Sequence, residues 1–178
     1  QYQLGTTFVV VTHDQDEAMT LASRIAVMSE GRIAQIGTPA EVYEYPANRY
    51  VAGFVGNINL IEGRVSGAAN GRLTLRSDAL DADLAVACDD PGAVNGEICV
   101  AVRPEKITIS RQPPEGADRN VVKGIVDQSI FLGDVTDLKI KVGEYLMQVR
   151  AHPTVLSTIG NRAFLRMRPE KCVAIAAG

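Results

Sequence analysis

The nine residues AVRPEKITI at positions 101–109 reappear as RMRPEKCVA at positions 166–174, with the central Arg-Pro-Glu-Lys unchanged. A second pair of similar segments precedes them, EGRV at 62–65 and KGIV at 123–126. Duplicated patterns of this kind indicate two similar structural units. Because proline cannot donate a hydrogen bond to a sheet, we expect it to end a strand in each copy. The sequence therefore predicts two β repeats, at about 57–111 and 121–178.

The charged residues of the repeat admit two interpretations. They could form a ligand or partner site, or they could cap and solvate the turn beside the proline. Repeated architecture repeats its turns, and the charges of those turns with them, so we favour the structural role. The residues concerned are Arg103, Glu105, Arg168 and Glu170.

Short runs of alternating apolar and polar residues surround the repeat, as in strands with one buried face. The breaks between them carry turn pairs such as Asn70-Gly71 and Asn95-Gly96. Several short strands at this spacing predict a small all-β barrel or sandwich. Residues 112–120, proline-bearing and poor in apolar side chains, are expected to form an exposed linker. The alternating runs lie at 72–76, 83–88, 97–102, 138–142, 145–149 and 165–167.

The pattern differs before Gly56, where helical and strand signals alternate. Residues 7–12 are rich in β-branched side chains without alternation, which is typical of a strand buried on both faces of a parallel sheet. A helix should follow, because Asp14 is a good N-cap and Glu17 lies three residues on. His13 would then lie between a strand's carboxyl end and a helix start, where open α/β sheets bind ligands.

Local signals divide the rest of this first segment. Two short strands, 25–28 and 32–36, are expected to pair across a glycine-bearing turn. A helix should start at Thr38, which has proline next to it and glutamate three residues on. Asn48 is placed to cap another helix, and Gly56 to end it. We expect a domain boundary between 1–56 and 57–178.

Composition narrows the possible functions. A net charge of −3 argues against a nucleic-acid partner, and the 5% aromatic content without Trp argues against a single-strand binder built on an OB-like barrel. No apolar run approaches the length of a membrane span. Three cysteines, Cys88, Cys99 and Cys172, without a Cys-x-x-Cys pair are expected to be free thiols in a reducing cytosol. With His13 and His152 far apart in sequence, we expect no metal site.

The segment THDQDEAM at 12–19 resembles the switch-histidine segment of ATP-binding cassette (ABC) ATPases, in the branch that serves sugar, iron and polyamine importers. The likeness continues without a gap to Gly56. The β repeats resemble the transport-associated OB-like (TOBE) module, whose two halves pack together and exchange strands in some members. The resemblance implies a mainly β fold, an OB-like β-barrel or sandwich regulatory domain preceded by the C-terminal α/β piece of a P-loop ATPase domain.

The same resemblance implies a function. His13 would be the switch histidine, which contacts the terminal phosphate of ATP and helps to hold the attacking water. The whole protein would be a homodimer that binds ATP and Mg²⁺ on the cytoplasmic face of the bacterial plasma membrane, with permease subunits and a solute-binding protein. Segments at 43–50, 57–63 and 102–107 look most like putrescine/spermidine importers, and iron(III) or sugar importers are the alternatives.

Most of the chemistry of an ATPase is missing from these residues. The chain has no Gly-x-x-x-x-Gly-Lys loop, no signature motif and no catalytic glutamate placed at a strand end. We therefore expect the chain to be the carboxyl-terminal fragment of an importer ATPase and to be inactive by itself. The competing hypothesis is a stand-alone regulatory module that binds a small solute or a protein.

Overall fold

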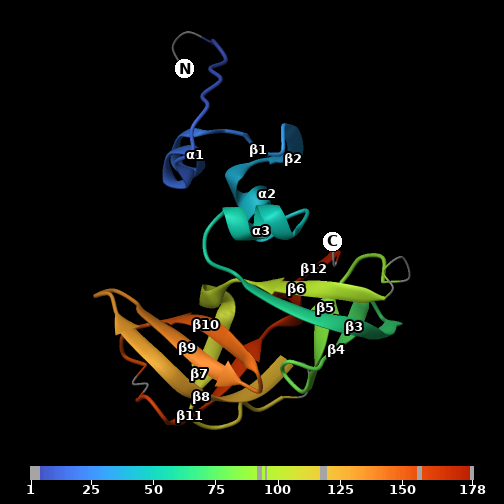
Figure 1. The fold of residues 1–178 in the computed structure, drawn as a ribbon, viewed down its shortest axis with the longest axis vertical. Helices are drawn as coiled ribbons and strands as arrows, with labels where there is room; N and C mark the ends of the chain where they lie inside the picture. The colour runs from blue at the N-terminus through green and yellow to red at the C-terminus, as the bar shows by residue number, and fades with distance from the viewer. Residues whose placement is uncertain (1–4, 92–93, 95, 117–119, 156–157, 177–178) are drawn as a thin grey trace.

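The computed structural model describes residues 5–91, 94, 96–116, 120–155 and 158–176. As expected, the fold is mainly β, with two five-stranded sheets and a smaller segment of short helices and a hairpin. Figure 1 shows this smaller segment above the sheets, with α2 and α3 next to β6 and β12. The OB-like class that the resemblance implied is confirmed by the curled, two-sheet arrangement.

Residues 5–56, here called the N-terminal module, contain three helices and one hairpin. Val27, Val42, Val51 and Val55 form its small buried cluster. The hairpin turns at Glu30 and Gly31, both with positive φ, as two-residue hairpin turns require. The predicted antiparallel pairing is confirmed. The elements are α1 (Gln15–Leu21), β1 (Ile25–Ser29), β2 (Arg32–Gly37), α2 (Pro39–Glu44) and α3 (Arg49–Phe54).

The helix starts follow their capping residues. Thr38 Oγ1 accepts from the Glu41 N–H at 3.3 Å, while the Glu41 carboxylate accepts from the Thr38 N–H at 2.7 Å, so the predicted capping box is complete. Asn48 Oδ1 accepts from the Val51 N–H at 2.9 Å and caps α3. Gly56, at φ +70°, follows the end of this helix as predicted.

The strand predicted for residues 7–12 is wrong. These residues form no strand, and the side chains of Val9 and Val11 are 89% and 95% exposed. A parallel strand buried on both faces needs a neighbour on each side and a layer over each face. The described residues supply neither, so the β-branched run has nothing to pair with.

The β domain contains the six strands that the alternation predicted and four further strands. The predicted runs became β4 (Arg72–Ser77), β5 (Ala82–Ala87), β6 (Glu97–Val102), β9 (Thr136–Val142), β10 (Tyr145–Ala151) and β11 (Arg162–Met167). The additional strands are β3 (Asn59–Ala69), β7 (Ile107–Ser110), β8 (Asn120–Phe131) and β12 (Val173–Ala176).

The two sheets are related by the repeat, and each borrows a strand. The first sheet has the order β12-β6-β3-β4-β5 and the second β10-β9-β8-β11-β7. The last strand of the first copy, β7, thus pairs in the second sheet, and β12 pairs in the first. This exchange agrees with what the resemblance implied. Each Arg-Pro-Glu-Lys turn forms a 3₁₀ turn, η1 (Pro104–Lys106) or η2 (Pro169–Lys171), just before the exchanged strand.

Two pairs of equivalent residues lock the halves together. Asn59 and Asn120 open β3 and β8, and both side chains are buried. The Asn59 amide accepts from the Gln148 N–H and donates to its carbonyl, both at 2.8 Å. Asn120 makes the same two bonds to Ala85, both at 2.7 Å. Each asparagine side chain therefore makes the pair of hydrogen bonds that a neighbouring strand would make, and so links one sheet to the other.

Part of the predicted linker is strand. Residues 112–116 lack regular structure and are mainly exposed, as expected, and 117–119 lie outside the described residues. Asn120, however, begins β8 and is buried, because the bonds to Ala85 satisfy its amide. The boundary between 56 and 57 stays a prediction, because the module and the sheets have their own apolar clusters while a third, smaller cluster joins them.

Candidate functional site

His13 lies in the turn before α1, as predicted, and its side chain is exposed. Among the described residues the structure gives it no hydrogen-bond partner. Asp14 caps α1 by accepting from the Glu17 N–H at 3.0 Å, and the Asp14 N–H donates to Thr12 Oγ1 at 3.0 Å. Glu17 does not return the bond, so the reciprocal half of that cap is wrong. A single exposed imidazole cannot form an active site, and the role of His13 stays a prediction.

A built polar site lies instead where the N-terminal module meets the first sheet. Arg103 is only 4% exposed. Its Nη1 donates to the carbonyls of Val55 at 2.6 Å, Asn57 at 3.1 Å and Ala52 at 3.3 Å. Its Nη2 donates to the Tyr43 carbonyl at 2.9 Å, and the guanidinium lies 4.0 Å from the centre of the Tyr43 ring. One side chain thus satisfies the carboxyl ends of both α2 and α3.

Other charged groups of the same turn support this contact. The Tyr43 hydroxyl donates to Glu105 at 2.8 Å, and Lys106 pairs with Glu44 at 2.8 Å. Burial lowers the pKa of Arg103, opposed by the nearby Tyr43 and Glu105. Burial, followed by the hydrogen bond to Glu105, raises the pKa of the Tyr43 phenol. The positive charge of Arg103 is compensated by groups of the protein itself, so this site is suited to holding the N-terminal module on the first sheet.

Apolar packing completes this joint, which we call the Arg103 joint. Ala52 of α3 is fully buried against Ala101 of β6 and Ile175 of the exchanged strand β12. Beside it, Arg49 pairs with Glu62 of β3 at 2.6 Å. Both copies of the repeat therefore contribute to the surface on which the module rests.

The favoured structural interpretation of the repeat charges agrees with the structure, but in the first copy the charges bond the N-terminal module instead of only capping or solvating their own turn. Arg103 and Glu105 hold the module, whereas Arg168 and Glu170 are exposed. The available signal lay two residues before the motif. The first copy has the small Ala101 there, opposite Leu60, whereas the second has Arg166, opposite Val121. A helix can pack closely on alanine but not on an arginine side chain.

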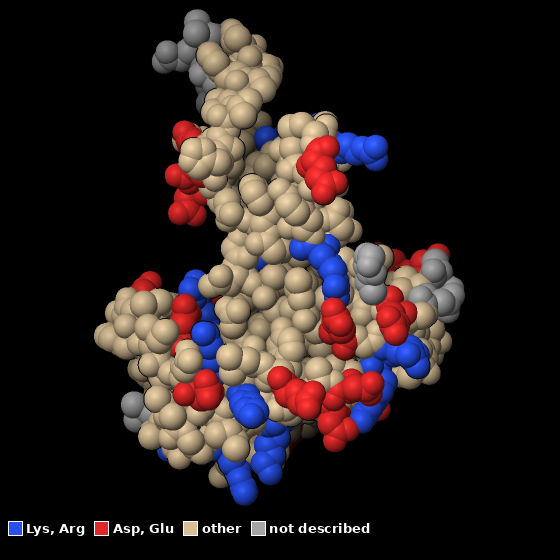
Figure 2. Space-filling model, viewed as in Figure 1, with Lys and Arg blue, Asp and Glu red and all other residues tan. Residues whose placement is uncertain are grey.

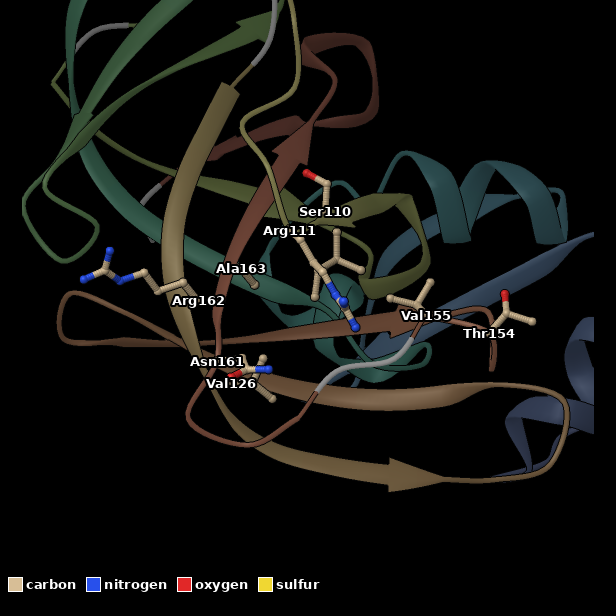
Figure 3. Close-up of a pocket in the computed structure, with 9 residues that line it drawn as sticks. Ser110, Arg111, Val126, Thr154, Val155, Asn161, Arg162 and Ala163 are labelled. Carbon is tan, nitrogen blue, oxygen red and sulfur yellow. The ribbon is translucent and has the colours of Figure 1, made fainter.

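A pocket of about 500 Å³ opens at the end of the second sheet. Gly124 pairs with Ala163 as Gly63 pairs with Ile98, so Ala163 and Ile98 are equivalent positions of the two repeats. The pocket lies beside Ala163, where the first repeat has the larger isoleucine. In Figure 3 the side chain of Arg111 extends between Ala163 and Val155. The pocket can accommodate a small polar solute, and sequence reasoning did not identify it. The lining is completed by Ile109, Ser110, Val126, Thr154, Asn161 and Arg162.

Cysteines, possible metal ligands and possible membrane-spanning helices were the other features to consider in the described residues. All three cysteines are free; Cys99 and Cys172 are buried, and burial raises the pKa of the Cys172 thiol to about 12. Within residues that the structure describes, no group of three His, Cys, Asp or Glu side chains is placed to hold a metal ion. None of the described helices has the length and apolar character that crossing a membrane requires.

Sequence comparison finds one family profile and several similar curated proteins. The family profile of the TOBE domain matches residues 100–175. The chain is 38% identical over 175 residues to the spermidine/putrescine import ATP-binding protein PotA of Acidothermus cellulolyticus, covering 96% of this chain and 45% of that protein. It is 37% identical over 179 residues to the putrescine transport ATP-binding protein PotG of Escherichia coli K12, covering 97% and 47%. The chain spans about half the length of these curated relatives.

Structure comparison supports the fold of the β domain. The cytoplasmic molybdate-binding protein ModG superimposes with a TM-score of 0.61, covering 66% of this chain and 95% of ModG. The sequences are only 12% identical, so the likeness shows the fold alone.

Proposed function

We propose that this chain, which belongs with the polyamine-import ATP-binding proteins over nearly its whole length and contains a TOBE domain, is the carboxyl-terminal and regulatory portion of an ABC importer's ATP-binding subunit. The observation that carries the proposal is the continuity of the match. Relatives named for import and ATP binding cover 96% and 97% of the chain, the N-terminal module and the β domain together.

In the complete subunit, His13 acts as the switch histidine toward ATP held with Mg²⁺. Its place before α1 supports this role, and the exposed apolar side chains from Phe8 to Val11 suit a surface that a larger domain covers. A hydrogen bond from an imidazole to a phosphate is typically worth about 1.5–3 kcal/mol. That is enough to tune a barrier, but the phosphate-binding loop and the base have to come from elsewhere.

The Arg103 joint gives this proposal a mechanical element. Its guanidinium bonds the ends of α2 and α3 to the turn after β6, so a displacement of either helix moves the β domain with it. We propose that the joint transmits movements of the ATPase domain to the regulatory domain. The subunit works as a homodimer with permease subunits and a solute-binding protein, peripheral on the cytoplasmic face of the plasma membrane.

The solute is proposed to be a polyamine, putrescine or spermidine, with iron(III) or a sugar as the alternative. The test is uptake of each labelled solute by cells that carry the intact importer, with and without the gene for this subunit. Loss of polyamine uptake alone supports the proposal. Loss of iron or sugar uptake with normal polyamine uptake would reassign the importer.

A second candidate function, a solute-sensing module, is favoured by the pocket beside Ala163. Calorimetric titration of the chain with polyamines, sugars and oxyanions separates the two. Binding that is lost in Ala163→Ile, which restores the side chain of the first repeat, supports sensing. Absence of any heat leaves the β domain a structural part of the subunit.

A further inference from the structure

The outer faces of the two sheets are equivalent by the repeat but carry different charges. On the first sheet, six charged side chains point outward from β3–β6, three cations and three carboxylates. Most of them pair: Arg64 with Glu97 at 3.3 Å, and Arg76 with Asp83 at 3.9 Å and also with Asp81. Part of this face also carries the N-terminal module. The first sheet therefore neutralises its own outer face.

The second sheet does not. The outward positions of β8–β11 carry six cations and two carboxylates, an excess of four positive charges. One carboxylate, Asp137, is engaged by Arg150 at 2.7 and 2.8 Å, which lowers the pKa of Asp137. None of the other five cations has a carboxylate partner among the described residues. These are Lys123, Lys139, Lys141, Arg162 and Arg166.

The strand registers show which equivalent positions account for the difference in charge between the two faces. Where the first sheet pairs Arg64 with Glu97, the second pairs Ile125 with Arg162. Where the first has Glu62, which holds Arg49 of the module, the second has Lys123. Each replacement removes a negative charge. Figure 2 shows Lys and Arg side chains gathered at the foot of the molecule, near β8 and β11.

Apolar side chains lie among these cations. Val121, Ile125 and Leu146 point outward from β8 and β10 and are 36%, 51% and 43% exposed. Phe164, which lies opposite Lys123 in the pairing of β11 with β8, is half-buried. In addition, Nε of Arg166 is buried without a hydrogen-bond partner in the described part of the chain. A surface that mixes unpaired cations with exposed aliphatic groups suits a partner that brings both acidic and apolar groups.

We propose that the outer face of β8, β9, β10 and β11, here called the basic face, docks an acidic protein surface with interspersed apolar side chains. A second copy cannot cover it face to face, because four excess positive charges would meet four more. A single-stranded nucleic acid fits less well, since this face offers one half-buried aromatic ring and no stacking platform. The partner occupies the position that the N-terminal module occupies on the first sheet.

The test uses a labelled amphipathic helical peptide of Glu and Leu as the acidic probe, with its Lys-for-Glu counterpart as control peptide. Binding to the chain is measured by fluorescence anisotropy at 50 and 500 mM salt. Lys123→Glu/Lys141→Glu/Arg162→Glu is compared with Arg24→Glu/Arg32→Glu/Arg64→Glu, which changes the same number of charges elsewhere. Circular dichroism shows whether each variant is folded.

The proposal predicts that the acidic peptide binds the wild-type chain and the control variant alike. It predicts weakening by about tenfold or more in the basic-face variant, and by 500 mM salt in all. Equal binding by both variants would overturn it. So would binding confined to vesicles with anionic lipid or to an oligothymidine, or a dimer in sedimentation that only the basic-face variant dissociates.

Discussion

Arg103 and Arg168 stand in the same four-residue motif, with nearly the same backbone angles, φ −72° and ψ 141° against φ −78° and ψ 134°. Arg103 is buried and bonded to the ends of two helices, whereas Arg168 is exposed. The motif therefore fixes the turn but not its use. The use depends on the sheet beside it, where Ala101 admits a helix and Arg166 does not.

The first way to test the difference removes each arginine in turn. Arg103→Ala leaves the carbonyls of Tyr43 and Val55 buried without their donor, and we expect a loss of about 3 kcal/mol in the free energy of unfolding. Arg168→Ala should change it by less than about 0.5 kcal/mol. Urea unfolding monitored by circular dichroism measures both. Equal losses would show that the two turns are used alike.

The second test concerns a feature that both repeats share. A Cβ at Gly63 would lie 2.5 Å from the Arg76 carbonyl oxygen, and one at Gly124 would lie 2.6 Å from that of Lys141. Alanine at either position should cost about 2 kcal/mol or more, because backbone has to move. Gly67→Ala, whose Cβ would have no atom nearer than 3.8 Å, is the matched control in the same strand as Gly63. Thermal unfolding that ranks the control with the others would contradict the packing.

The third test compares the two buried asparagines. Asn59→Ala and Asn120→Ala each leave one N–H and one carbonyl of a facing strand unpaired, and each should cost about 2 kcal/mol. Asn161→Ala, on an exposed loop, should cost less than about 0.5 kcal/mol. Similar losses at 59 and 120 would confirm the symmetry, and a loss at only one of them would break it.

The smallest expected effect is alkaline. Burial raises the pKa of the Cys172 thiol from 9.0 to about 12 in the folded chain. The unfolded chain then loses this proton first, so the thiol's contribution is complete below pH 9.0 and is lost as pH rises toward 12. At pH 10 the loss is about 1.4 kcal/mol. Stability of wild type minus that of Cys172→Ala should therefore fall between pH 8 and 10, and parallel curves would contradict the burial.

Local signals were sufficient for much of the fold. Thr38, Asn48 and Gly56 specify helix ends through bonds within a few residues, so their positions were predicted correctly. The short strands were also predicted correctly, because their alternation of apolar and polar residues is visible within a few residues. The long strand β3 was not, because Gly63 and the bulge near Gly67 interrupt its alternation.

Long-range contacts account for the rest. Residues 7–12 have the composition of a central strand, but strand formation depends on neighbours that the described residues do not supply. Asn120 ends a segment with the composition of a linker, and its burial depends on hydrogen bonds to Ala85, which is distant in sequence. Arg103 could not be distinguished from Arg168 by the motif, because its partners lie 46 to 60 residues before it. His13 was found by resemblance, and its role is still a proposal.

The most direct measurement is ATP hydrolysis by the full-length subunit, with and without His13→Ala, beside the same assay on this chain. The account predicts that the full-length subunit hydrolyses ATP, that His13→Ala slows hydrolysis by about tenfold to a hundredfold while nucleotide binding persists, and that the isolated chain is inactive. Hydrolysis by the isolated chain, or a full-length subunit indifferent to His13→Ala, would contradict the account.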